Sequence, residues 1–129
     1  MPKVGTWIRV KASVEGLTGH KTAIGWPIHD AVPFVALPSH TALRKAIVVH
    51  NPANGRSVQA LVLDVGPWNT LDDDYVFDGA RPQAESGTDL YGRTTNGAGI
   101  DLGEYVRKAL GITGMGEVEW AFLLEPTHS

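Results

Sequence analysis

The sequence predicts a single, mainly β domain of 129 residues. A chain of this length can bury a hydrophobic core of its own. Its 15 glycines and 8 prolines predict many turns, which is typical of a fold built from short strands. Several short apolar or alternating segments are bounded by turn residues, as strands are. The hydrophobic share of 43% and the charged share of 19% are those of an ordinary globular protein.

Local patterns place four strands along the chain. Trp7 to Val14 alternates apolar and polar residues and predicts the first strand. Ala46 to His50 and Arg56 to Val65 predict a hairpin, because the turn between them ends in Asn54-Gly55, a pair that favours positive φ. Alternation resumes at Val118, so we expect the chain to close on a strand.

The remaining segments predict one helix and two stretches without regular structure. Leu102 to Leu110 has a helical apolar face, with Asp101 as a candidate N-cap and Gly111 at the C′ position. Recurrent prolines predict extended, loop-like chain from Trp26 to Pro38. Residues 69–99 are polar and glycine-containing, and we expect a long inserted loop there, of a length that is more often functional than idle.

Composition excludes several classes of function. The net charge of −3 and the lack of a basic cluster argue against a nucleic-acid partner. No apolar run approaches the roughly 20 residues of a membrane-spanning helix. The absence of cysteine removes disulfides, thiol nucleophiles and cysteine metal sites. The five histidines have no paired spacing, and we expect no metal and no cofactor. Nothing in the sequence indicates an oligomeric state.

Two aspartates stand at the ends of apolar runs. Asp64 follows Ala60 to Leu63 and precedes the turn-forming pair Gly66-Pro67, and Asp101 lies between Ile100 and Leu102. Two acids held by a rigid scaffold are what the cleavage of glycosidic bonds requires. Aspartates in such places also tie down turns and cap helices, so both interpretations are open at this point.

Four pieces of sequence then occur in a familiar order. They are Gly19-x-Lys21-Thr22-Ala23-x-Gly25, Val49-x-Asn51-x-x-Asn54-Gly55-Arg56-Ser57-Val58, Asp64-x-Gly66-Pro67-Trp68, and Ile100-Asp101-Leu102 followed by Ala109-Leu110-Gly111. From about residue 12 to 123 the chain resembles the RlpA-like (rare lipoprotein A) family, whose fold is similar to that of expansins, barwin proteins and family 45 endoglucanases. The resemblance implies a six-stranded double-psi β-barrel with one short helix, a groove across one face, and activity on the glycan of the bacterial cell wall.

The chain departs from the family at two places. The family has a histidine thought to work with the aspartate, and counting back from Asn51 that position falls on Pro38, with His40 as the nearest candidate. The family also joins the segments around Asp64 and Asp101 by a short link, where this chain has residues 69–99. That insertion is expected to reshape or cover one end of the groove.

The resemblance implies cleavage of peptidoglycan glycan strands, as a lytic transglycosylase or a glycoside hydrolase. A transglycosylase can work with one acid, because a hydroxyl of the sugar itself attacks in place of water. We expect Asp64 to be the general acid, in a partly apolar site that raises its pKa, with Asp101 assisting. The alternatives are that Asp64 accepts hydrogen bonds from the turn at Gly66 to Trp68, and that Asp101 only caps the helix.

Other side chains are candidates for substrate binding. Trp68 and Tyr75 could stack on sugar rings, Thr22 could donate a hydrogen bond into the groove, and His40 could replace the family histidine. The run Asp72-x-Asp74-x-x-x-Asp78-Gly79 has the oxygen ligands of a calcium loop but not the distal Glu of an EF-hand, so we expect no calcium site.

Two other functions stay open. One is a non-catalytic, expansin-like module that binds cell-wall polysaccharide, and the other is a structural or assembly protein, for instance of a phage. The first residues lack an apolar signal core. We therefore expect either a periplasmic or extracellular protein whose leader precedes this sequence, or one that stays in the cytoplasm until it is released by another route.

Overall fold

The structure is a computed structural model, and it describes residues 3–14 and 32–124. The described chain consists of strands and two short α-helices, with 3₁₀ turns at His40–Ala42 and Gln83–Ser86. The strands are β1 (Lys3–Val4), β2 (Ile8–Val14), β3 (Phe34–Leu37), β4 (Ala46–His50), β5 (Ser57–Val65), β6 (Ile100–Leu102) and β7 (Gly116–Leu124), and the helices are α1 (Asp73–Asp78) and α2 (Glu104–Leu110).

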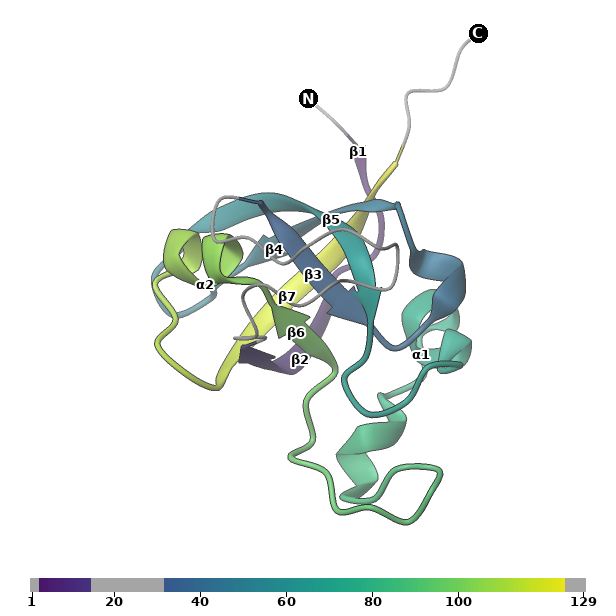
Figure 1. Cartoon of the computed structure of the whole chain (residues 1–129). Helices are drawn as coiled ribbons and strands as arrows, with labels where there is room; N and C mark the ends of the chain where they lie inside the picture. The colour runs from purple at the N-terminus through teal and green to yellow at the C-terminus, as the bar shows by residue number, and fades with distance from the viewer. Residues whose placement is uncertain (1–2, 15–31, 125–129) are drawn as a thin grey trace, which may run out of the picture.

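Six of the strands close into a barrel, which confirms the predicted fold class (Figure 1). Their order is β7-β2-β6-β3-β5-β4, and β4 pairs back to β7, while β1 pairs with the last two residues of β7, Leu123 and Leu124. The pairs β2–β6 and β3–β5 are parallel, and the remaining neighbours in the ring are antiparallel. Closure leaves the barrel strands without a free edge.

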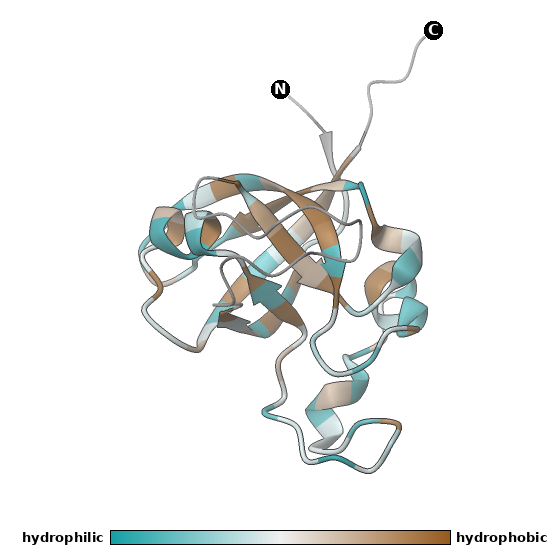
Figure 2. Ribbon diagram, viewed as in Figure 1, coloured by the Kyte–Doolittle hydropathy of each residue, from teal (hydrophilic) through white to brown (hydrophobic). Residues whose placement is uncertain are grey.

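The core fills the inside of the barrel. Every second residue of a strand points inward, so Val35 and Leu37 of β3 meet Val62 of β5 in the main hydrophobic cluster. Trp120 of β7 is fully buried in the same cluster. Figure 2 shows the hydrophobic segments concentrated in the barrel strands. No helix in the described part of the chain has the length and hydropathy needed to cross a membrane.

The β4–β5 hairpin is confirmed. It pairs antiparallel from His50↔Ser57 to Ala46↔Leu61, and its turn includes Gly55 at φ 78°. The side chains of Asn51 and Asn54 both donate from Nδ2 to the Leu110 carbonyl oxygen, at 2.9 Å each. These bonds satisfy a carbonyl at the end of α2 and fix the hairpin turn to that helix.

The predicted helix begins later than expected, and Asp101 does not cap it. Helix α2 starts at Glu104 with Gly103 as its N-cap residue, because Ile100, Asp101 and Leu102 are paired in strand β6. A Cβ on Gly103 would lie 2.6 Å from the Phe34 ring, so only glycine lets this helix start approach β3. The expected end of the helix is confirmed, with Gly111 at φ 72°.

Two segments expected as loops contain regular structure. Phe34–Leu37 is the fully buried strand β3, because its prolines stand at positions 33 and 38, outside the paired residues. The insertion 69–99 contains helix α1, which buries Tyr75 and Val76 and ends at Gly79 with φ 81°. One helical turn and a half is too short to show a clear periodic pattern in the sequence.

Candidate functional site

Asp64 and Asp101 lie in one row across four neighbouring strands. Ala36 of β3 pairs with Asp64 of β5 on one side and with Asp101 of β6 on the other, and Asp101 in turn pairs with Ser13 of β2. Residues that pair in register point to the same side of a sheet. The side chains of Ser13, Asp101, Ala36 and Asp64 therefore share the outer wall of the barrel, opposite to the core residues that flank them.

A β-bulge brings Asp64 into this row. Val35 pairs with Val62, but the next residue, Ala36, pairs with Asp64, so Leu63 is the extra residue on β5. Without the bulge, Ala36 would pair with Leu63, and the Asp64 side chain would point into the barrel. Leu63 instead packs with Phe34 in a small apolar cluster separate from the main core. The bulge thus turns a carboxyl outward at the end of a buried strand.

Asp101 is the carboxyl with the altered acidity. Burial raises its pKa above the ordinary 3.8, the hydrogen bond from Ser13 opposes that effect, and the charge of Asp64 raises the pKa further. The Ser13 hydroxyl donates to Asp101 Oδ1. The other carboxyl oxygen, Oδ2, lies 4.0 Å from where a Cβ on Gly66 would stand. Asp101 is therefore held by β2 and faces the turn that follows β5.

Asp64 is half-buried, and its Oδ1 accepts a hydrogen bond of 2.9 Å from the Val65 amide. The alternative from the sequence was bonding to the amides from Gly66 to Trp68. The Gly66 amide instead donates to the Leu37 carbonyl oxygen, at 3.1 Å.

The turn after β5 places Trp68 beside the row. Gly66 has φ 140° and precedes a cis peptide bond to Pro67, and Trp68 has φ 68°. The Trp68 Nε1 donates to Asn96 Oδ1 at 2.9 Å, and Lys11 Nζ donates to the Asn96 carbonyl oxygen at 3.0 Å. Trp68 is half-buried, so part of it stays open to a ligand.

Of the three remaining predicted binding residues, the structure describes Tyr75 and His40. Tyr75 is fully buried and cannot stack on a sugar, so that prediction is wrong. Its hydroxyl donates to the Gly99 carbonyl oxygen and accepts from Trp120 Nε1, both at 2.9 Å, and burial raises its pKa well above the usual value. His40 is exposed in the 3₁₀ turn after β3. Thr22 and the Gly19 to Gly25 motif lie outside the described residues.

Two members of the row, Ser13 and Ala36, were not predicted. Ser13 is an outward residue of an alternating strand, and only that alternation could have indicated its side. Ala36 lies in an apolar tetrapeptide that gives no sign of which residue faces out. Ala36 is buried, and its side chain is a single methyl group between the two carboxyls of the row.

Acidic residues of the insertion hold its own segments together and bond it to the turn after β3. Asp72 is buried and accepts from the Gln83 amide at 2.8 Å, and burial raises its pKa. Asp73 accepts hydrogen bonds from the hydroxyls of Ser39 and Thr41. Within residues 3–14 and 32–124, no three His, Asp or Glu side chains gather in a group that could hold a metal ion.

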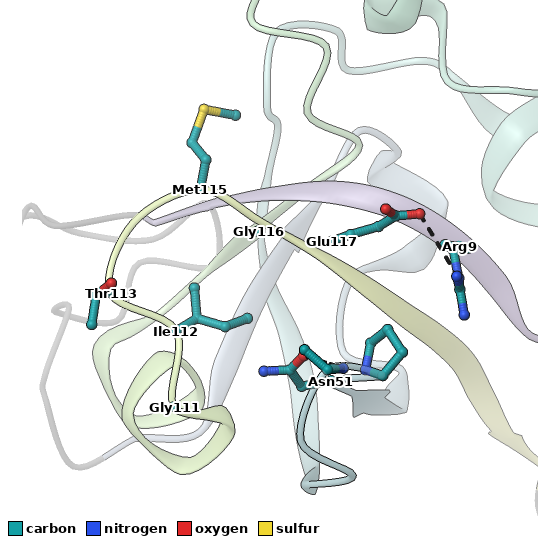
Figure 3. A pocket seen from close by; sticks show the side chains of 10 residues that line it. Arg9, Asn51, Gly111, Ile112, Thr113, Met115, Gly116 and Glu117 are labelled. Carbon is teal, nitrogen blue, oxygen red and sulfur yellow. Dashed lines mark hydrogen bonds and ion pairs between the residues drawn. The ribbon is translucent and has the colours of Figure 1, made fainter.

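Several surface hollows lie elsewhere on the barrel. One of about 500 Å³ lies between the hairpin turn at Asn51 and the link from Gly111 to Glu117 (Figure 3). Figure 3 shows Met115 pointing away from the hairpin turn, and Glu117 in an ion pair with Arg9, 3.8 Å from nitrogen to oxygen. These residues are separate from the aspartate row.

The fold and the row together define a small β-barrel protein with a pair of carboxyls on its outer wall. The chain belongs to the family described as a domain of unknown function, DUF8814, which it matches over residues 6–121. Among solved structures it is similar to the Streptomyces papain inhibitor (SPI), with 15% identity and a TM-score of 0.55. That similarity covers 96% of this chain and 100% of the inhibitor chain, and it concerns the fold. No curated protein matches the sequence.

Proposed function

We propose that this protein cleaves the glycan strands of peptidoglycan, as a lytic transglycosylase, with Asp64 and Asp101 as the reacting pair. The observation that carries the proposal is the shared pairing of both aspartates with Ala36, which directs both carboxyls to one side of the barrel. The ordered motifs that resemble the RlpA-like family support the choice of substrate. That resemblance also covers the two aspartates themselves.

The acid in this proposal is Asp101. The sequence alone favoured Asp64, but burial and the neighbouring charge both favour the protonated form of Asp101. A carboxyl with a raised pKa holds its proton to a higher pH, which favours its use as the acid that protonates a leaving oxygen. The Ser13 hydroxyl holds Oδ1, which orients Oδ2 as the donor position.

The reaction then needs one proton transfer at each carboxyl. Asp101 protonates the glycosidic oxygen as the bond from that oxygen to the anomeric carbon breaks. The 6-hydroxyl of the same sugar attacks the anomeric carbon and forms an internal anhydro ring. Asp64 accepts the proton that this hydroxyl loses. Trp68 would support a sugar ring next to the scissile bond.

The test is digestion of purified sacculi, with soluble anhydro-muropeptides as the readout. We expect the wild type to release them, and Asp101→Asn and Asp64→Asn each to lower the rate by about 10²-fold or more. Asp78→Asn is the matched control, because Asp78 is an exposed carboxyl on α1 outside the row. Release at the wild-type rate by Asp101→Asn would contradict the proposal.

The same experiment distinguishes a module that only binds glycan. Pro38 at the position of the family histidine favours that alternative. Retention of the wild type on sacculi, without any soluble product over a long incubation, would replace the catalytic proposal by the binding one.

A second candidate function is inhibition of a papain-like cysteine protease. Its support is the solved inhibitor, whose whole chain aligns with this one. Papain assayed with a small peptide substrate, in the presence of increasing wild-type protein, tests it directly. Full papain activity at a large excess of the protein would exclude this candidate.

A further inference from the structure

A tightly held turn projects from the insertion at residues 88–94. Thr88 and Thr94 form an isolated antiparallel bridge at its base. The side chain of Asp89 is fully buried in the turn and accepts from the amides of Tyr91 and Arg93, at 2.9 and 2.8 Å, and from Arg93 Nε. The Asp89 amide donates to the Arg93 carbonyl oxygen, and Gly92 closes the turn at φ 82°. The backbone of this turn is therefore fixed from within.

The turn exposes an aromatic ring in a fixed position. Tyr91 is 83% exposed, although the amide of the same residue is bonded to Asp89. The Arg93 guanidinium lies over the Tyr91 ring, 5.6 Å from its centroid, and the same guanidinium is paired with Asp89. Arg93 thus covers one face of the ring and leaves the other open. An ordered, exposed ring loses little freedom when a ligand binds to it.

The turn is connected to the candidate site through Asn69. The Leu90 amide donates to Asn69 Oδ1 at 3.1 Å, and Asn69 directly follows Trp68. The path through Asn69 and Leu90 limits the separation of the Trp68 and Tyr91 Cα atoms to about 16 Å, given the fixed bond and hydrogen-bond lengths. A short stretch of glycan can span that separation. The Asn69 side chain is itself buried, so this connection is a rigid one.

We propose that the open face of Tyr91 is a stacking platform for a sugar ring of the glycan strand, at a distance from the aspartate row. The proposal rests on the proposed function in one respect, that the ligand is a peptidoglycan glycan. The C–H face of a pyranose ring packs on an aromatic face, while the tyrosine hydroxyl stays in water. Tyr91 takes the role that the sequence assigned to the buried Tyr75.

The experiment measures binding to soluble peptidoglycan glycan strands of defined length, in an Asp101→Asn background so that binding does not depend on cleavage. We expect Tyr91→Ala to weaken binding of long strands about tenfold, and Tyr91→Trp to restore it. Thermal unfolding of each variant confirms that the barrel is intact.

Leu90→Ala is the matched control. Leu90 is 65% exposed on the same turn, but its side chain is aliphatic and offers no stacking face. We expect this variant to bind long strands as the parent does. An equal loss in Leu90→Ala and Tyr91→Ala would overturn the platform in favour of a general apolar contact. Relief of papain inhibition by Tyr91→Ala, with glycan binding unchanged, would overturn it in favour of a protein contact.

The outcomes separate the two proposals. If the wild type releases no product from sacculi but strand binding depends on Tyr91, the proposed cleavage is overturned and the stacking platform is supported. If the wild type releases product but Tyr91→Ala binds long strands as tightly as its Asp101→Asn parent, the stacking platform is overturned and the proposed cleavage is supported. A wild type that binds no glycan overturns both.

Discussion

Asp64 and Asp101 are two strands apart in the barrel, yet both pair with the same residue, Ala36. The spacing between neighbouring strands puts the Cα atoms of the two aspartates about 10 Å apart across a methyl group. That arrangement explains why the charge of Asp64 acts on the pKa of Asp101. The same arrangement means that a substitution at the uncharged residue Ala36 should alter the positions of both carboxyls.

The buried carboxyl of Asp101 should reduce stability at neutral pH. The folded chain holds the Asp101 proton more tightly than the unfolded chain does, because burial raises the pKa. The stability contributed by this proton is fully present below the ordinary pKa of 3.8 and is lost as the pH rises through the raised value. We therefore expect Asp101→Asn to unfold at a higher temperature than the wild type at pH 7, with the difference shrinking toward pH 3.5 or so. Thermal unfolding followed by circular dichroism at a series of pH values measures this, and a constant difference would contradict it.

Ala36→Val tests whether the reaction depends on the small residue between the two carboxyls. Ala36 is 1% exposed, so two added methyl groups should cost about 1–3 kcal/mol of stability and separate the two side chains. We expect the release of anhydro-muropeptides to fall more than the fraction of folded protein does. Ala36→Gly, which adds no bulk between the carboxyls, should cost about 0.5–1 kcal/mol and retain activity. Equal activities of the two folded variants would show that the size of the residue between the carboxyls is irrelevant.

Tyr75→Phe tests the assignment of Tyr75 to the core. The change leaves the buried Trp120 Nε1 and the Gly99 carbonyl oxygen without their partner, which should cost about 1–3 kcal/mol. Denaturant unfolding should show that loss, with glycan binding per folded molecule unchanged. Tyr105→Phe, at an exposed position on α2, should change stability by less than about 0.5 kcal/mol. Weaker glycan binding without a loss of stability would return Tyr75 to the binding surface.

Gly103→Ala tests the close approach of α2 to β3. The new Cβ would meet Phe34 ring carbons at 2.6 and 2.7 Å and its carbonyl oxygen at 2.9 Å, so the helix start must shift, at a cost of about 1–3 kcal/mol. Gly114→Ala is the control, because nothing lies within 4 Å of its added Cβ. The midpoints of urea unfolding compare the two, and similar midpoints would argue against the tight packing described here.

The elements that could be predicted are those marked by residues close together in the sequence. The Asn54-Gly55 pair fixes the hairpin through its turn geometry, and the helical face before Gly111 places α2 and its end. In contrast, the start of α2 depends on the pairing of Asp101 with Ser13 and Ala36, which are 88 and 65 positions away in the chain. Local capping rules give no information about such distant partners.

The sequence identified the two aspartates of the candidate site, but it did not predict how their side chains are arranged. Asp64 and Asp101 were identified from their motifs, whereas the β-bulge that turns Asp64 outward depends on how β3 and β5 pair. Likewise, Tyr75 and Tyr91 are both aromatic residues in a polar insertion, and only their three-dimensional surroundings separate the buried ring from the exposed one. Burial of that kind is decided by packing against the barrel.

The most direct measurement of the central claim is an NMR titration of the Asp101 carboxyl in the wild type and in Asp64→Asn. We predict a pKa for Asp101 above the ordinary 3.8 in the wild type, and a lower pKa in Asp64→Asn, since that variant lacks the neighbouring charge. An Asp101 that titrates at its ordinary value, identically in both proteins, would contradict the claim that the two carboxyls form a coupled pair.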